Sequence, residues 1–265
     1  MTIKGIDVSS HNGRVDWEKA KKHIDFAIIR AGFGKENIDT RFERNISECN
    51  RLKIPAGAYW FSYAYTEQMA LNEAKFLCSL LSKYEVTYPV AYDFEYDSVS
   101  FANKHDVVVS TDLMCSMADI FLKYVCQSGY KPILYTNLDF YNRGFDRLAD
   151  SYDIWFAQWK VSKPSKPCSI WQYSDNGTID GVPGQPDLNI SYVEYRNDVN
   201  NNLDNSLKTN IANKLPDKWW LNYRDVAKDV IDGKYGNGDT RKAKLKASGF
   251  DYTVVQTIVN YLLGK

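Results

Sequence analysis

"PVAYDFEYD", residues 89–97, alternates apolar or aromatic side chains with acidic ones. Successive side chains of a β-strand point to opposite faces of the sheet. If the stretch is one strand, a single face carries three acids: Asp93, Glu95 and Asp97. Carboxylates inside an apolar strand are costly unless they are paired or used. The stretch therefore predicts a strand that carries a chemical site.

The surrounding sequence repeats a strand-then-helix pattern. Further strands are predicted at 3–9, 26–32, 54–64, 132–137, 154–159 and 169–174, with helices at 16–23, 40–53, 66–83 and within 104–128. Repeated β–α alternation implies a mainly parallel sheet or barrel. We expect an α/β protein whose main domain is an irregular TIM-like β/α barrel.

The composition changes after Arg196 and divides the chain. Residues 197–218 are rich in Asn, Asp and Lys and read as a linker. In 219–265 three helices fit, separated by "GKYGNGD" and "SGFD", with helix ends predicted at Gly233 and Gly249 and N-caps at Asp239 and Asp251. The expected organisation is a catalytic barrel over 1–196, a linker over 197–218 and a three-helix module over 219–265.

Charge and composition exclude several classes of function. A formal net charge of +0 argues against nucleic-acid binding by bulk electrostatics. No stretch reaches the roughly 18 apolar residues of a membrane span. The five cysteines form no CxxC pair, and the three histidines form no HExxH motif, so neither a metal nor another cofactor is expected. The first residues lack a secretory pattern, which indicates synthesis in a cytoplasm unless a signal has been removed.

Four acids are predicted to meet at one end of the barrel. Sites in β/α barrels lie at the carboxyl ends of the strands. Asp7 is near the end of the first strand, Asp93 and Glu95 end the opening strand, and Asp187 follows the last strand region. A pair of carboxyl groups is what hydrolysis of a glycosidic bond requires.

Six motifs occur in an order that resembles a known family. They are "GIDVSSHNG" (5–13), "GAYWFSYA" (57–64), "DFE" (93–95), "WFAQW" (155–159), "WQYS" (171–174) and "PDLN" (186–189). Residues 3–195 thereby resemble a family 25 glycoside hydrolase, a lysozyme that cuts the muramic acid linkage of peptidoglycan. Trp60 and Trp159 depart from residues that are frequent in the family, and both departures concern the sugar subsites.

This resemblance implies a role for each acid. Glu95 would be the general acid, with its pKa raised by the neighbouring acids. Asp93 would either attack the anomeric carbon or position the acetamido group of the substrate, which attacks instead, while Asp7 and Asp187 would shape the electrostatic field. Candidates for sugar contacts are Tyr59, Tyr63, Tyr135 and Trp171. Retention of the anomeric configuration is expected.

The tail also resembles a known module. Residues 226–263 are similar to the CW-seven type of cell-wall-binding repeat, which implies that bacterial peptidoglycan is the partner. A module of about 45 residues has a marginal core, so docking on the barrel and self-association both stay open. Together the two resemblances predict a phage endolysin, made in the host cytoplasm and acting on the wall after its release.

Three alternatives remain beside that prediction. The chain could be a wall-binding protein without catalysis, although the intact Asp93 and Glu95 argue against this. It could be a bacterial autolysin with the same chemistry. A chitinase-like barrel is disfavoured, because the longer acidic pattern DxxDxDxE is absent upstream of Glu95.

Overall fold

Eight strands close into a barrel. The computed structural model describes residues 3–195, 223–248, 250 and 252–263. The ring order is β1-β9-β8-β7-β6-β5-β4-β2, and β1 pairs with β2 to close it. The strands are β1 (Ile3–Val8), β2 (Phe26–Phe33), β4 (Ala56–Phe61), β5 (Val90–Asp93), β6 (Pro132–Asn137), β7 (Asp153–Ala157), β8 (Ile170–Ser174) and β9 (Asp187–Ser191). This confirms the predicted irregular TIM-like barrel of the α/β class.

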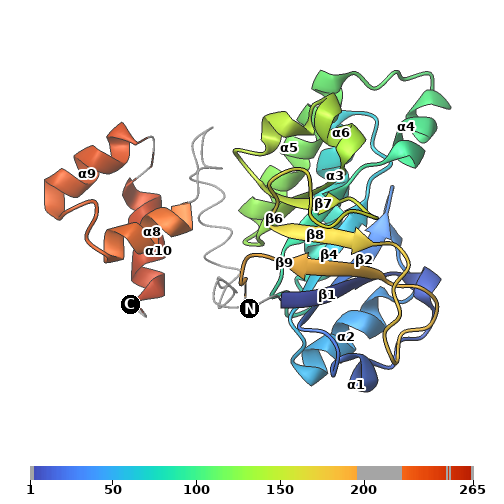
Figure 1. The fold of residues 1–265 in the computed structure, drawn as a ribbon. Helices are drawn as coiled ribbons and strands as arrows, with labels where there is room; N and C mark the ends of the chain where they lie inside the picture. Colours follow the sequence, from blue (N-terminus) through green and yellow to red (C-terminus); the bar gives the residue numbers. More distant parts are fainter. Residues whose placement is uncertain (1–2, 196–222, 249, 251, 264–265) are drawn as a thin grey trace. The chain divides into compact units, whose positions relative to one another are not determined.

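One strand makes the barrel irregular. Seven of the ring's strands run parallel to one another, whereas β9 is antiparallel to both of its neighbours, β8 and β1. A short strand, β3 (Asn37–Ile38), pairs with β2 outside the ring. In Figure 1, β8, β9 and β1 face the viewer, with no described helix drawn in front of them.

Helices connect and cover the remaining strands (Figure 1). They are α1 (Trp17–Ala20), α2 (Phe42–Leu52), α3 (Glu67–Leu81), α4 (Tyr96–Asn103), α5 (Thr111–Gln127) and α6 (Leu138–Arg143), with 3₁₀ turns at Ser10–Asn12 and Phe145–Leu148. The hydroxyl of Thr66 accepts the backbone N–H of Met69 and so caps the first turn of α3. After α5 the chain turns at Gly129, whose φ of +84° suits glycine.

Alternating side chains build two separate cores. Residues such as Ile6, Ala58 and Tyr92 point outward and pack under the helices. The other set, which includes Ile28, Ala91 and Ile133, fills the barrel interior. Aromatic rings pack at the amino ends of the strands, where Phe26 stacks on Tyr88 at 4.4 Å and Tyr88 meets Tyr195 edge-on at 5.1 Å. This packing fills the interior there and leaves polar side chains at the carboxyl ends.

Two predictions about this part of the chain were wrong in detail. The opening strand ends at Asp93, so Asp97 does not share a strand face with it; Glu95 is instead the N-cap of α4. The helix predicted within 104–128 is α5, and a separate helix, α4, which was not predicted, precedes it. The segment from Asp187 was expected to follow the last strand, yet it forms β9.

The described residues of the C-terminal unit form three helices, as predicted for 219–265. Contacts divide the chain into Met1–Asn201 and Asn202–Lys265. The second unit holds α8 (Tyr223–Ile231), α9 (Gly238–Ala247) and α10 (Tyr252–Leu262), packed around residues such as Val230, Leu245 and Val255. Gly233 has a φ of +83° just after α8, as expected for a helix end.

One prediction for this unit differs from the structure, and others concern residues that the structure does not describe. The N-cap of α9 is Asn237 rather than Asp239, which lies in the first turn. The predicted helix end at Gly249, the cap at Asp251 and the whole linker at 197–218 lie outside the described residues.

Candidate active site

The predicted acids meet at the carboxyl ends of the parallel strands. Asp7 on β1 is the register partner of Asp187 on β9, because antiparallel β9 begins where β1 ends. Asp93 ends β5, and Glu95 follows it in extended conformation. Only 6% of Asp7 and 4% of Asp93 are exposed, whereas Glu95 and Asp187 are half-buried. We call this group of four acids the mouth of the barrel.

Asp7 and Asp187 form one carboxyl pair. Burial raises the pKa of Asp7, while the side-chain amides of Asn189 and Gln172, which donate to its Oδ2 atom at 2.7 and 2.9 Å, oppose that rise. Burial, followed by the charge of Asp7, raises the pKa of Asp187 from 3.8 to about 8. The two carboxyl groups therefore titrate as a coupled pair, in which the amide donors on Asp7 favour Asp187 as the member that keeps a proton.

Asp93 and Glu95 form the second pair. Burial, followed by the charge of Glu95, raises the pKa of Asp93 well above its ordinary value. Burial also raises the pKa of Glu95, while its hydrogen bond with Asp93 opposes that rise. Like-charge repulsion from Asp97 and Asp7 is thus secondary to burial for Glu95, where the sequence had suggested that repulsion is the cause. Since Asp93 is the more buried of the two and its pKa is raised well above its ordinary value, Asp93 is the favoured holder of a shared proton.

One oxygen of Asp93 has an open hydrogen-bonding position. Its Oδ1 atom is buried and has no partner among the described residues. A buried acceptor without a partner costs about 1–3 kcal/mol. Such a cost is common where a bound substrate supplies the missing donor. The arrangement therefore suits a ligand that brings an N–H or O–H group to Asp93.

Gln172 and Asn189 orient the first pair, and the sequence reasoning missed both. The Trp155 indole N–H donates to Asn189 Oδ1 at 2.8 Å. The Tyr135 hydroxyl donates to Gln172 Oε1 at 3.1 Å, so the amide N–H of each residue is turned toward Asp7. Both residues are buried polar positions inside the quoted motifs "WQYS" and "PDLN". In the sequence, the alternation of these two polar residues with apolar neighbours could have indicated that their side chains point into the barrel.

The four aromatic candidates fall into two groups. Tyr59 on β4 and Tyr135 on β6 point into the barrel, where both contact Trp155. Tyr63 is half-exposed just after β4, and Asp97, Arg30 and Asp93 act electrostatically on its hydroxyl.

Trp171 is the candidate that the structure does not bring to the mouth. It precedes the inward-pointing Gln172 on β8, so it points to the opposite face of the strand. Its indole N–H donates to the backbone carbonyl of Gln158 at 2.9 Å. The sugar contact expected for Trp171 is therefore not supported by its orientation.

A surface hollow of about 470 Å³ lies next to the mouth. Trp159 and Tyr173 line it, together with the polar residues Lys160, Ser174, Asp175, Asn176 and Gln185. The indole N–H of Trp159 reaches Gln172 Oε1 at 3.3 Å, so the hollow joins the hydrogen bonds that hold Asp7. An aromatic and polar lining of this kind suits sugar rings.

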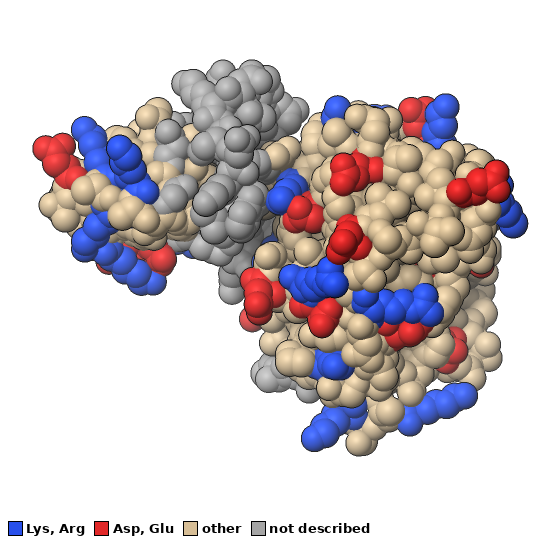
Figure 2. Space-filling model, turned by 90° about the horizontal axis from the view of Figure 1, so that it is seen from above, with Lys and Arg blue, Asp and Glu red and all other residues tan. Residues whose placement is uncertain are grey.

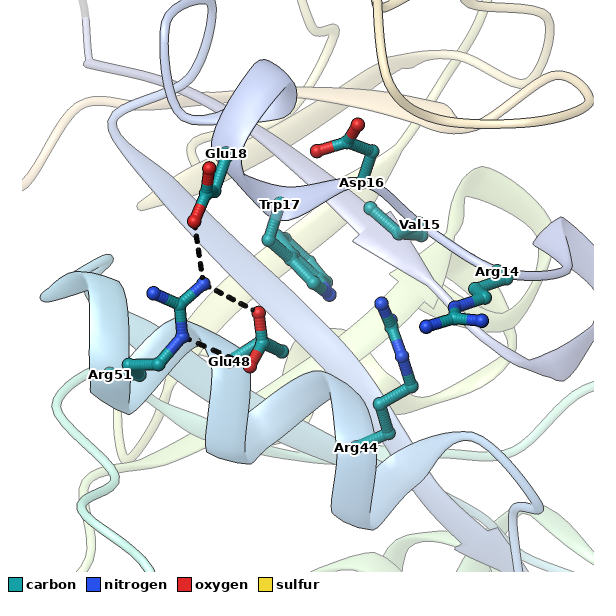
Figure 3. A pocket seen from close by; sticks show the side chains of 8 residues that line it. All are labelled: Arg14, Val15, Asp16, Trp17, Glu18, Arg44, Glu48 and Arg51. Carbon is teal, nitrogen blue, oxygen red and sulfur yellow. Dashed lines mark hydrogen bonds and ion pairs between the residues drawn. The ribbon is translucent and has the colours of Figure 1, made fainter.

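A second hollow, of about 370 Å³, is lined by α2 and the segment 14–18. Figure 3 shows Arg51 between Glu18 and Glu48, with ion-pair distances of 3.0 and 2.9 Å. None of the four acids of the mouth lines this hollow. Because these charges are exposed to solvent, which screens them, the ion pairs contribute little to stability.

A barrel whose mouth holds paired, partly protonated carboxyl groups defines the class of the glycoside hydrolases. Residues 6–182 match the model of glycosyl hydrolases family 25, and the chain belongs to this family. Residues 224–263 match the model of the CW_7 repeat. The two resemblances expected from the sequence are thus confirmed.

Individual relatives agree with this assignment. Lysozyme M1 of Streptomyces globisporus is 28% identical over 203 residues, covering 71% of this chain and 67% of that protein. The lysozyme of Streptococcus phage Cp-7 is 23% identical over 270 residues, covering 96% and 68%. The structure of a family 25 glycosyl hydrolase from Bacillus anthracis aligns with a TM-score of 0.63 and 27% identity, over 75% of this chain and 92% of that one.

We predict that Asp187→Asn stabilises the fold more at pH 8 than at pH 4. The pKa of Asp187 is raised from 3.8 to about 8, so between these values the unfolded chain loses a proton that the folded chain keeps. Wild-type stability attributable to this group therefore falls as pH rises. Asparagine does not titrate, and its amide N–H can still donate to Asp7. Melting temperatures of both proteins, measured from pH 4 to 8, test this; a gap that stays constant or narrows with rising pH would contradict it.

Proposed function

We propose that this chain is a lysozyme of the muramidase type, which hydrolyses the β-1,4 bond between N-acetylmuramic acid and N-acetylglucosamine in peptidoglycan. The observation that carries the proposal is the meeting of two buried carboxyl pairs at the mouth of a family 25 barrel. The CW_7 match in the tail supports the same substrate. No described helix is long and apolar enough to cross a membrane.

In the proposed mechanism, Glu95 protonates the leaving glycosidic oxygen. It is more exposed than Asp93, which lets it reach a bound glycan. The proton must then lie on Glu95 when substrate is present. An acetamido N–H that donates to Asp93 would favour ionised Asp93 and so shift the shared proton to Glu95. The open oxygen of Asp93 supports this route, in which the acetamido oxygen attacks the anomeric carbon.

The other mouth residues have supporting roles in this scheme. In its ionised form, which two amides favour, Asp7 would stabilise the positive charge that develops at the anomeric centre, while Asp187, whose pKa is raised to about 8, would carry the proton of that pair. Tyr59, Tyr63 and Tyr135 provide sugar contacts. The site residues use no metal or other cofactor in this scheme.

We further propose three segments with separate roles: the catalytic barrel at 1–196, a linker at 197–218 and a wall-binding module at 219–265. In α9 the basic residues are Arg241, Lys242, Lys244 and Lys246, and Figure 2 shows basic side chains gathered on the C-terminal unit. On the barrel face in Figure 2, acidic and basic residues are interspersed, which does not favour nucleic acid as a partner. Self-association of the module is left as an open part of the proposal.

The biological setting that fits best is a phage endolysin, made in the host cytoplasm and released to the wall at lysis. A phage lysozyme is the relative above whose match extends over 96% of this chain. A bacterial autolysin with the same chemistry is the second candidate, because an autolytic lysozyme of Clostridium acetobutylicum is 26% identical over 189 residues, covering 70% of this chain and 55% of that protein.

We predict that Glu95→Gln removes nearly all lytic activity and leaves the fold intact. General acid catalysis contributes about 10²–10⁴-fold. The assay is release of soluble fragments from purified walls. Asp97→Asn is the matched control, because Asp97 is an exposed acid on the first turn of α4. A folded Glu95→Gln protein with activity within threefold of wild type would rule out Glu95 as the acid.

The second prediction is that hydrolysis retains the anomeric configuration. The carboxyl groups of Asp93 and Glu95 are close enough for each to act on the pKa of the other, which suits the roughly 5–5.5 Å separation of retaining enzymes better than the roughly 6.5–9.5 Å that leaves room for a water molecule. NMR of the first product formed distinguishes the two outcomes. An inverted first product would exclude both double-displacement routes.

The third prediction concerns the module. A fragment of residues 1–205 should turn over soluble muropeptide glycans at the rate of the full chain but bind intact walls less tightly, because tethering raises local substrate concentration without changing the chemistry. Wall binding is measured by co-sedimentation. Loss of soluble-substrate turnover in a folded fragment would show instead that the tail completes the active site.

A further inference from the structure

Helix α3 carries a buried carboxylate outside the mouth. Among the described acids, four are almost fully buried: Asp7, Asp39, Glu73 and Asp93. Asp7 and Asp93 belong to the mouth, and Asp39 forms an ion pair with Arg30 at 2.8 Å. Glu73 is only 4% exposed and forms no ion pair with any described residue. Burial of an unpaired carboxylate costs several kcal/mol, so its hydrogen bonds need an explanation.

Both oxygens of Glu73 bind the turn that follows β4. The Ser62 hydroxyl donates to Oε2 at 2.6 Å, and the backbone N–H of Tyr63 donates to Oε1 at 3.1 Å. The Ser62 oxygen in turn accepts the backbone N–H of Ala64 at 3.1 Å. One side chain of α3 therefore fixes three consecutive residues at the end of a barrel strand.

The same turn is bonded to a residue of the mouth. The backbone N–H of Ser62 donates to the backbone carbonyl of Asp93 at 2.7 Å. The residue before it, Phe61, is the register partner of Asp93 in the β4–β5 pair. The turn also carries Tyr63, whose hydroxyl is within electrostatic reach of Asp93. A displacement of Ser62 would thus be passed directly to the backbone of Asp93.

We propose that Glu73 is a positioning residue for the reaction: through Ser62 and Tyr63 it holds the end of β4 and, with it, the backbone of Asp93. This inference rests on the proposed function. Burial raises the pKa of Glu73 to about 7, while Ser62 and Tyr63 favour the ionised form, which accepts both of their hydrogen bonds. An apolar residue could fill the same space, but it could not orient two donors.

The first test is Glu73→Gln in the full chain, with kcat and KM measured on a soluble peptidoglycan glycan. Glutamine keeps the shape but replaces one acceptor with a donor that faces Ser62. We expect kcat to fall about 10-fold with KM within twofold, because misplacement of a reacting group by 1 Å can cost 10²-fold. Glu67→Gln is the matched control: it changes an exposed acid on the same helix whose partner is the Ser116 hydroxyl, and its kcat should equal that of wild type.

The second variant, Ser62→Ala, removes the same hydrogen bond from the other side. It should lower kcat by a similar factor. The kcat of the double variant should be no lower than that of the less active single variant, because the two residues act as one unit. Folded fractions are measured by circular dichroism at the assay temperature.

These measurements distinguish a positioning role of Glu73 from a purely structural one. The positioning role would be overturned if folded Glu73→Gln keeps the kcat of wild type or changes KM alone. It would also be overturned if the effects of the two substitutions add in the double variant, or if the loss of activity only follows the loss of folded protein. Absence of hydrolysis by wild type and Glu67→Gln alike would instead refute the proposed function.

Discussion

Four carboxyl groups share one small mouth, and their need to share protons governs the rest of the site. Two buried carboxylates in contact cannot both ionise at low cost. The structure arranges them as Asp7 with Asp187 and Asp93 with Glu95, and the pKa of every one of the four is raised, with burial as the largest cause, which favours one shared proton in each pair. Within the first pair, amide donors fix which member is ionised. The second pair lacks such donors at Asp93, and its proton is therefore free to move when a substrate arrives.

The antiparallel strand β9 makes the first pair possible. In a fully parallel barrel the last strand would deliver only its final residues to the mouth. Because β9 runs the other way, its first residue, Asp187, lies opposite Asp7, and Asn189 follows two positions deeper on the same face. The indole of Trp155 then fixes Asn189 from the barrel interior. The antiparallel strand that makes the barrel irregular therefore supplies two of the residues around Asp7, namely Asp187 and Asn189.

The sequence predicted the parallel part of the fold and all four acids of the mouth. Strand 132–137 was placed at its observed bounds, because a short apolar run there follows the break at Gly129. Strand β9 was missed, because its inward residues are polar and turn-forming residues precede it. The end of β5 was missed because acidic alternation continues into α4. The outward orientation of Trp171 and the contacts of Glu73 depend on register and helix packing, which one sequence does not reveal.

The central claim is that each pair holds one proton at neutral pH. The most direct test is a titration of the full chain with ¹³C-labelled Asp and Glu, in which carboxyl shifts of the four residues are followed by NMR. The account predicts that one carboxyl of each pair stays protonated at pH 7 and that Asp187 ionises near pH 8, in accord with its raised pKa of about 8. Full ionisation of all four carboxyls by about pH 5, as for ordinary Asp and Glu, would contradict it.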